Sequence, residues 1–116
     1  MNPFLLLIMQ KGEIWSVALP DVDGHEQVGR RPAIVLADTD LPVVIIVPCT
    51  ANMQALRFPF TMLLETSKSN GLEVASVALI FHLRAIDRKR LMKKIGFVGK
   101  LEMGKVKRII RDMLDL

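Results

Sequence analysis

The sequence predicts a mainly β domain of the α+β class that ends in one amphipathic helix. Two observations predict it: apolar, β-branched runs typical of strands fill most of the chain, and helical periodicity is confined to its C-terminal end. This order favours an α+β domain or a compact barrel with an appended helix over an alternating parallel α/β fold. The length of 116 residues suits one domain, and a composition of 51% hydrophobic and 24% charged residues indicates a packed core.

The first three expected strands lie in the N-terminal half. Glu13 to Leu19 alternates two sets of side chains, as a strand with unlike faces does. Ala33 to Leu36 and Val43 to Val47 are continuous apolar runs, and Pro42 and Pro48 bound the second of them. Such runs are typical of strands inside a sheet with both faces covered.

The second half is expected to add more strands. Phe58 to Leu64 and Val74 to Leu83 are apolar, and the polar turn formers of Thr66 to Gly71 separate them as a loop. Asp87 is a suitable N-cap for one or two helical turns in the basic segment that follows it. We expect Lys94 to Val98 to return as a strand.

A helix is expected from Leu101 to the end of the chain. Its apolar residues recur at the three- and four-residue spacing of an amphipathic helix. They are Met103, Val106, Ile109, Ile110, Met113 and Leu114, and the basic residues Lys105, Lys107, Arg108 and Arg111 take the other side.

Positive charge is concentrated toward the C-terminus. The formal net charge is +4, and 11 of the 16 Lys and Arg residues fall between Arg84 and Arg111, where only Asp87 and Glu102 oppose them. A cationic patch of this kind attracts a polyanion or an acidic protein partner over a long range. A solvated helix face explains the same pattern equally well.

Cysteine content and hydropathy exclude several classes of protein. Cys49 is the single cysteine and no Cys and His cluster has metal-ligand spacing, so we expect no disulfide, no metal, no cofactor and a reducing, cytoplasmic location. Neighbouring side chains of a strand point to opposite faces, so the Cys49 thiol should point away from the Thr50 hydroxyl and into the core. The apolar run from Phe4 to Met9 is far shorter than the roughly 20 residues of a membrane span.

Four segments resemble successive landmarks of the MazF/PemK/Kid toxin family in order and in spacing. They are Lys11 to Val17 (KGEIWSV), Gly24 to Leu36 (GHEQVGRRPAIVL), Val47 to Thr50 (VPCT) and Arg84 to Gly96 (RAIDRKRLMKKIG). The resemblance implies an SH3-like β-barrel with flanking helices, as in the MazF, Kid and CcdB plasmid toxins, and a homodimer. It also implies sequence-specific cleavage of single-stranded mRNA and neutralisation by a cognate MazE-like antitoxin with an acidic, disordered segment.

The resemblance begins near Met9. Residues 1–8 are therefore expected to be an N-terminal extension, and residues 9–116 to form a single toxin domain. We expect Met9 to be the natural initiator, and an additional N-terminal strand is the competing account.

Arg31 and Thr50 are the expected catalytic residues. Without a metal, the ribose 2′-OH attacks the adjacent phosphate, and a guanidinium can donate two hydrogen bonds to the charge that accumulates on the phosphoryl oxygens. Arg30 and Arg31 stand at the mouth of an expected strand, and Pro32 biases Arg31 toward an extended backbone. The resemblance makes Arg31 the catalytic arginine and Thr50 the hydroxyl that helps to fix the scissile phosphate.

Several other residues are expected to bind RNA or to support the site. An imidazole such as that of His25 can relay a proton or bind a phosphate, and its loop neighbours would shape the segment before the arginines. The supporting residues are His25, Glu26, Gln27, Arg30, Phe81, His82 and Arg84.

Phe81 departs from the family pattern. That pattern implies an acidic residue at Phe81, a glutamine at His82 and, in some members, an arginine at Leu79. Because neighbours on a strand face opposite ways, we expect only one of Phe81 and His82 in the RNA groove, where Phe81 would stack on a base and accept no proton. The identity of the general base is therefore open. Arg31 and Thr50 could act without one, His25 could serve as the base, or His82 could do so if the strand register is shifted.

Two functions follow. The first is a toxin endoribonuclease that leaves 2′,3′-cyclic phosphate and 5′-OH ends, with Arg31 as the main electrostatic catalyst. The second is a catalytically weakened or non-catalytic barrel that binds RNA or a protein target such as gyrase, since fold does not fix function.

Overall fold

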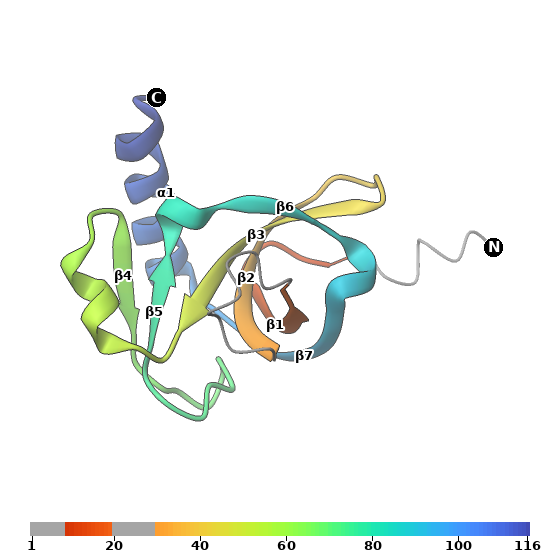
Figure 1. Ribbon diagram of the computed structural model, residues 1–116, viewed down its shortest axis with the longest axis horizontal. Coiled ribbons are helices and arrows are strands. Elements are labelled where there is room, and N and C mark those ends of the chain that lie inside the picture. Colours follow the sequence, from red (N-terminus) through yellow and green to blue (C-terminus); the bar gives the residue numbers. More distant parts are fainter. Residues whose placement is uncertain (1–8, 20–29) are drawn as a thin grey trace.

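The computed structural model describes residues 9–19 and 30–116. Within them, seven strands form one sheet and the chain ends in an α-helix (Figure 1). The strands are β1 (Glu13–Ala18), β2 (Arg30–Asp38), β3 (Val43–Thr50), β4 (Thr61–Leu64), β5 (Ser76–Leu79), β6 (Arg84–Asp87) and β7 (Leu91–Phe97). Three short 3₁₀ turns, η2 (Met53–Arg57), η3 (Ile80–His82) and η4 (Arg88–Arg90), precede the helix α1 (Lys100–Leu114).

The sheet is antiparallel and strongly curved. Its strand order is β4-β5-β3-β2-β1-β7, and β6 also pairs with β3. β3 can hold two partners on one edge because β6 pairs with its first half, from Val43 to Ile46, and β5 with its end, at Cys49 and Thr50. The strand pairings of the described residues stay open between β6 and β7, which the short η4 turn connects. The mainly β fold with a C-terminal helix is confirmed, in the form of a curled sheet without a closed ring of hydrogen bonds.

The three N-terminal strands were located correctly; β1 ends one residue earlier than expected, and β2 and β3 are longer than their apolar runs. β2 starts at Arg30 because Arg30 and Arg31 pair with Ala18 and Val17 of β1. β3 continues through Pro48, which lies opposite Ala33, as far as Thr50. Strand pairing therefore carries both ends of this hairpin beyond the hydrophobic segments.

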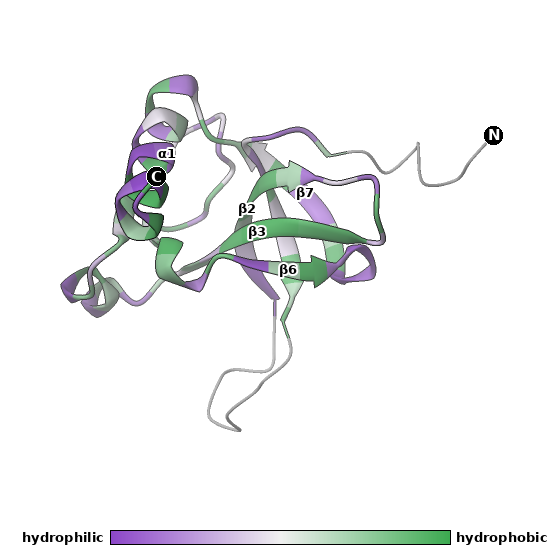
Figure 2. Cartoon of the chain, turned by 90° about the horizontal axis from the view of Figure 1, so that it is seen from above, coloured by the Kyte–Doolittle hydropathy of each residue, from purple (hydrophilic) through white to green (hydrophobic). Residues whose placement is uncertain are grey.

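The expected helical signals of the second half are confirmed. The Asp87 carboxylate accepts a hydrogen bond from the Lys89 backbone N–H at 2.9 Å and so caps η4. α1 spans Lys100–Leu114, and its hydrophilic and hydrophobic sides are visible in Figure 2. No helix in the two described ranges is long and apolar enough to cross a membrane.

The sequence prediction was wrong for the apolar stretch from Val74 to Leu83, and only partly right for Phe58 to Leu64, of which Thr61–Leu64 forms β4. In the first of these stretches we expected one strand, but the structure has the short strand β5, the η3 turn and then β6 from Arg84. Leu83 N–H donates to the Ile80 carbonyl at 3.0 Å, which closes the turn. An apolar run does not by itself distinguish a strand from a strand followed by a tight turn.

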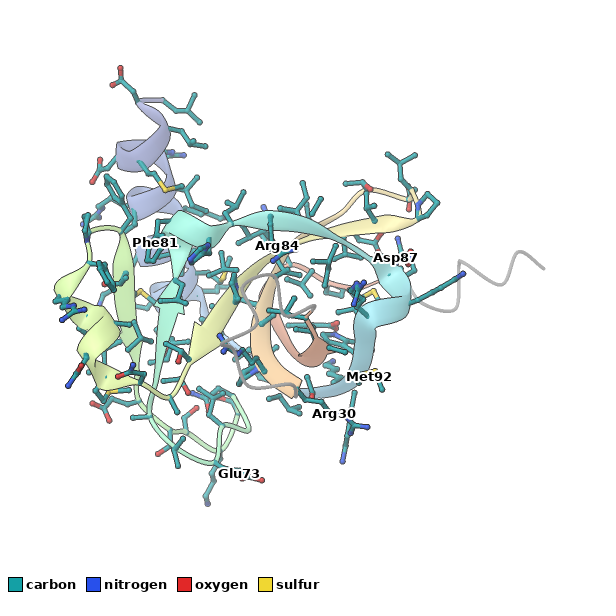
Figure 3. The ribbon with its side chains drawn as sticks, viewed as in Figure 1. Arg30, Glu73, Phe81, Arg84, Asp87 and Met92 are labelled. Atoms are coloured by element: carbon teal, nitrogen blue, oxygen red, sulfur yellow. The ribbon has the colours of Figure 1, made fainter. Side chains whose placement is uncertain are left out.

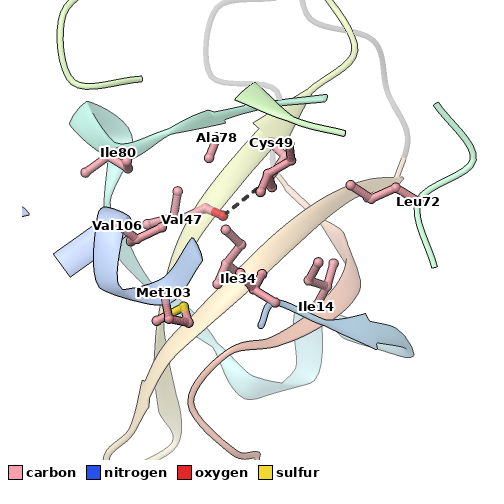
Figure 4. Packing of buried hydrophobic residues seen from close by; sticks show 11 residues of the cluster. Ile14, Ile34, Val47, Cys49, Leu72, Ala78, Ile80, Met103 and Val106 are labelled. Atoms are coloured by element: carbon pink, nitrogen blue, oxygen red, sulfur yellow. Dashed lines mark hydrogen bonds between the residues drawn. The ribbon is translucent and has the colours of Figure 1, made fainter. Parts of the chain in front are cut away.

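The main core lies between the curled sheet and α1 (Figure 4). The central strands contribute Ile14, Ile34 and Val47 to this core, and the helix contributes Met103 and Val106. Each such side chain contributes about 1.5–3 kcal/mol when it is removed from water. The Cys49 thiol is also part of this core, as expected from the sequence, and burial raises its pKa to about 12. Cys49 is therefore a packing residue.

A buried ion pair lies at the end of β2, next to a second core cluster whose Met9 contacts Arg88. Arg88 Nη1 donates to Asp38 Oδ2 at 2.8 Å, and Arg88 Nη2 donates to Asp38 Oδ1 and to the Leu41 carbonyl. The two charged side chains are only 5% and 4% exposed. The Met9 backbone nitrogen donates to the same Asp38 carboxylate at 2.9 Å. The hydrogen bond from Arg88 holds the pKa of Asp38 well below its usual range.

Candidate active site

A pocket of about 510 Å³ opens where β2 begins and β3 ends. We call it the β2–β3 pocket. Its polar and aromatic lining residues are Arg30, Arg31, Thr50, Asn52, Phe58, Phe81 and His82. The volume is within the range of about 300–1,000 Å³ that is usual for ligand sites.

Strand register brings Arg31 and Thr50 together although they are distant in the sequence. Ala33 of β2 lies opposite Pro48 of β3 where the paired register ends, so Arg31 near the start of β2 and Thr50 at the end of β3 lie at the same end of this hairpin. On its other side Arg31 pairs with Val17 of β1. The Arg31 backbone is therefore held in an extended conformation, and its side chain is half-buried whereas that of Arg30 is exposed. The expected proximity of Arg31 and Thr50 is present, and their catalytic roles remain predictions.

The Thr50 hydroxyl is oriented by the turn that follows it. Its Oγ1 accepts a hydrogen bond from the Asn52 backbone N–H at 3.2 Å. The Asn52 side chain in turn accepts from the Gln54 backbone N–H at 3.0 Å and caps η2. A hydroxyl that accepts from the backbone retains its own hydrogen, which can be donated to a ligand oxygen in the pocket.

Aromatic side chains form one wall of the β2–β3 pocket. The Phe58 and Phe81 rings meet edge to face with centroids 5.9 Å apart, and the Phe81 and His82 rings are 4.4 Å apart. The Phe81 backbone N–H donates to the Phe60 carbonyl at 3.2 Å, which ties η3 to the segment before β4. Phe58 and Phe81 are 45% and 38% exposed, so each presents a face to a ligand.

The expectation that only one of Phe81 and His82 faces the groove was wrong. Both line the β2–β3 pocket. The reason is that they lie in the 3₁₀ turn η3 and not in a strand. Successive side chains of a 3₁₀ turn differ by about one third of a rotation, so neighbours can share a side, whereas strand neighbours point to opposite faces.

Of the other expected site residues, the structure places one outside the pocket and does not describe three. Arg84 is on β6 opposite Ile46, outside the β2–β3 pocket, and Figure 3 shows it well away from Arg30. His25, Glu26 and Gln27 lie outside the described residues. No carboxylate is among the described residues that line this pocket. Among all residues that the structure describes, no group of three or more His, Cys, Asp or Glu side chains is placed to hold a metal ion.

Comparison with known proteins identifies the family. Residues 10–114 match the model of the PemK-like, MazF-like toxins of type II toxin–antitoxin systems. The chain belongs to this toxin family. Among its relatives is the endoribonuclease MazF9 of Mycobacterium tuberculosis, 33% identical over 94% of this chain and 98% of the relative. The endoribonuclease EndoA of Bacillus subtilis is 31% identical over 95% of this chain and 97% of its own.

Solved structures agree on the fold of this MazF-like chain. A crystal structure of MazF from Deinococcus radiodurans superposes with a TM-score of 0.75 at 24% identity, and covers 94% of this chain and 98% of the other. The toxin MazF-mt6 of Mycobacterium tuberculosis superposes with a TM-score of 0.70 at 19% identity, over 90% of this chain and 97% of the other. At these identities the likeness concerns the fold alone.

Sequence reasoning missed two of the polar and aromatic residues that line the β2–β3 pocket. Asn52 orients Thr50, and Phe58 extends the aromatic wall of Phe81. The signal for Asn52 was present, because asparagine is one of the favoured N-cap residues. Phe58 was assigned to an apolar run, and nothing local in the sequence distinguishes an exposed aromatic residue from a core one.

Proposed function

We propose that this MazF-like chain is a toxin that cuts single-stranded RNA without a metal ion, in the β2–β3 pocket. The observation that supports this most directly is that Arg31 and Thr50 line the same pocket. The ribose 2′-oxygen loses its proton and forms a bond to phosphorus, while the bond from phosphorus to the 5′-oxygen breaks and that oxygen takes up a proton. The products are a 2′,3′-cyclic phosphate and a 5′-OH end.

Arg31 and Thr50 would stabilise the charge that develops on the phosphate. Negative charge grows on the non-bridging oxygens, and donors fixed in advance are most effective because they need no reorganisation. The Arg31 backbone is paired with β1, and the Thr50 hydroxyl is held by Asn52. A guanidinium supplies two parallel N–H groups and the threonine supplies one O–H.

The proton acceptor has to come from a group other than the acidic residue of the family pattern, which Phe81 replaces. His82 lies in the pocket beside Phe81, and a neutral imidazole nitrogen can accept a proton. His25 is the second candidate, as proposed from the sequence. Phe81 has a flat aromatic ring, and we assign it a different role, which is to stack on a base next to the cleaved phosphate.

Phe81→Ala should weaken RNA binding by about tenfold or more, because stacking of one base on an aromatic ring is worth about 1–3 kcal/mol. The loss should appear mainly in KM, since Phe81 contacts the base and not the phosphate. Steady-state cleavage of a fluorescent RNA measures it. Phe97→Ala is the matched control, because Phe97 is 51% exposed on β7 and outside the pocket. Equal effects of the two substitutions would contradict the stacking role.

The proposed activity is tested by incubating the purified protein with single-stranded RNA in EDTA. We expect cleavage to continue, with cyclic phosphate and 5′-OH ends identified by mass spectrometry and by 5′-end phosphorylation. The second candidate function, a barrel that binds RNA or gyrase without cutting, is favoured by the lack of a carboxylate among the described residues of the pocket. Binding with no cleavage of any RNA would support it and refute the nuclease.

We expect the toxin to act as a homodimer and to be neutralised by a cognate MazE-like antitoxin. An acidic, disordered segment of the antitoxin would fold onto the basic surface and block the RNA groove. The exposed basic residues of α1 support an acidic partner; they are Lys100, Lys105, Lys107, Arg108 and Arg111.

A further inference from the structure

A second pocket, of about 310 Å³, adjoins the β2–β3 pocket at the two arginines. Both pockets are lined by Arg30, Arg31, Pro32 and Ala51, so the arginines stand between two hollows. The far wall of the second pocket is the loop before β5, including Glu73. Figure 3 shows Glu73 on this loop and Arg30 at the start of β2, both in the lower part of the view.

The loop that carries Glu73 is fixed in place by buried hydrogen bonds. Asn70 is 3% exposed, and its side-chain oxygen accepts from the backbone N–H groups of Ser67 and Leu72 at 3.1 and 3.0 Å. Its side-chain nitrogen donates to the Glu65 carbonyl at 2.8 Å. The loop therefore holds its shape without a ligand, which lowers the entropy cost of binding one.

Close backbone contact also presses this loop against β7. Gly71 has a φ of +67°, and a Cβ at this position would lie 1.8 Å from the Ile95 carbonyl oxygen, so only glycine fits. The Phe97 backbone N–H donates to the Ser69 carbonyl at 2.9 Å. Leu72 then enters the main core, and Glu73 follows it at a fixed position.

The Glu73 carboxylate is unfavourable in a site that binds only phosphate, because both groups are negatively charged. Glu73 is the one acidic residue among the described residues of the second pocket, and a carboxylate repels the phosphates that Arg30 and Arg31 attract. A carboxylate can only accept hydrogen bonds, and in nucleic-acid recognition it accepts them from amino groups on base edges. The neighbouring Val74 is 55% exposed and offers apolar surface for the plane of a base.

We propose that the second pocket binds the base of a nucleotide next to the cleaved phosphate, and that Glu73 selects a base with an exocyclic amino group against uracil. This inference rests on the proposed function, because it requires an RNA strand to pass Arg31. A phosphate between the two pockets has one nucleoside on each side. The aromatic wall of Phe58 and Phe81 would take one base, and the pocket with Glu73 would take the other.

The test uses a single-stranded RNA library randomised around the cleavage site, with the new 5′-OH ends sequenced. For the unmodified protein we expect one position at which uracil is depleted by about tenfold or more. Glu73→Gln should accept uracil at that position, because an amide both donates and accepts hydrogen bonds. Glu65→Gln is the matched control, an exposed carboxylate near the same loop that lines neither pocket, and it should leave the preference unchanged.

Two results would overturn the inference. One is the same base preference for Glu73→Gln as for the unmodified protein. The other is an equal fall in cleavage of all sequences, which would make Glu73 a proton acceptor or a structural residue. A parallel binding experiment with a 2′-O-methyl library, which cannot be cleaved, separates this inference from the proposed function. If Glu73 determines which RNAs bind but no RNA is cleaved, the proposed nuclease activity is refuted and the base pocket is supported. If RNA is cleaved but Glu73 has no effect on which RNAs bind, the base pocket is refuted and the nuclease activity is supported.

Discussion

Arg31→Ala should lower the rate of RNA cleavage by about 10³-fold or more while the protein remains folded. The reason is that the β2–β3 pocket offers few groups to meet the charge on the phosphoryl oxygens. Of its two arginines Arg31 is the less exposed, its backbone is paired with β1, and Thr50 lines the same pocket. Arg31→Lys should restore only a small part of the rate. A lysine keeps the charge but loses the planar pair of donors.

Single-turnover cleavage in EDTA measures this loss, and circular dichroism with thermal unfolding checks the fold. Arg108→Ala is the charge-matched control, because Arg108 is exposed on α1 and outside the pocket. Arg30→Ala should show an intermediate loss, since Arg30 lines the pocket but its side chain is more exposed than that of Arg31. A folded Arg31→Ala protein that cuts as fast as Arg108→Ala would refute the proposed mechanism.

The sequence was sufficient for the family, for most strands and for the terminal helix. Apolar runs and helical periodicity locate β1, β3 and α1 because burial imposes these patterns directly. The pairing of β2 with β3 explains why two motifs that the family resemblance singled out, at Arg31 and at Thr50, occupy one pocket. The strand pairing itself carries no local signal in the sequence, so the resemblance supplied what the pattern could not.

The parts of the site that the sequence did not predict depend on turns and loops. The η3 turn places Phe81 and His82 on the same side, and a three-residue turn is too short to leave a periodic pattern. Glu73 is an isolated carboxylate, which on sequence grounds is an ordinary surface residue. Its position beside the arginines follows from the contact of Gly71 with β7, which only the folded chain reveals.

Asp38→Asn should destabilise the protein by about 3 kcal/mol or more at pH 7, because it leaves the buried charge of Arg88 without its carboxylate. The effect bears on the site as well as on stability. Arg88 also binds the Leu41 carbonyl, in the turn that joins β2 to β3, and so fixes one end of the hairpin whose other end carries Arg31 and Thr50. Urea unfolding at pH 7 measures the loss, with Asp112→Asn on the exposed surface of α1 as the control.

The same pair determines how stability should depend on pH. The pKa of Asp38 is lowered in the folded protein, so the ionised carboxylate stabilises the fold fully above its unfolded pKa of about 3.9. This stabilisation is lost as the pH falls below that value toward the folded pKa. The difference in unfolding free energy between the unmodified protein and Asp38→Asn should therefore be largest near neutral pH and shrink between about pH 4 and pH 2. A difference that stays constant over this range would show that the cost of Asp38→Asn comes from packing, and that the ion pair with Arg88 does not control the stability of this hairpin.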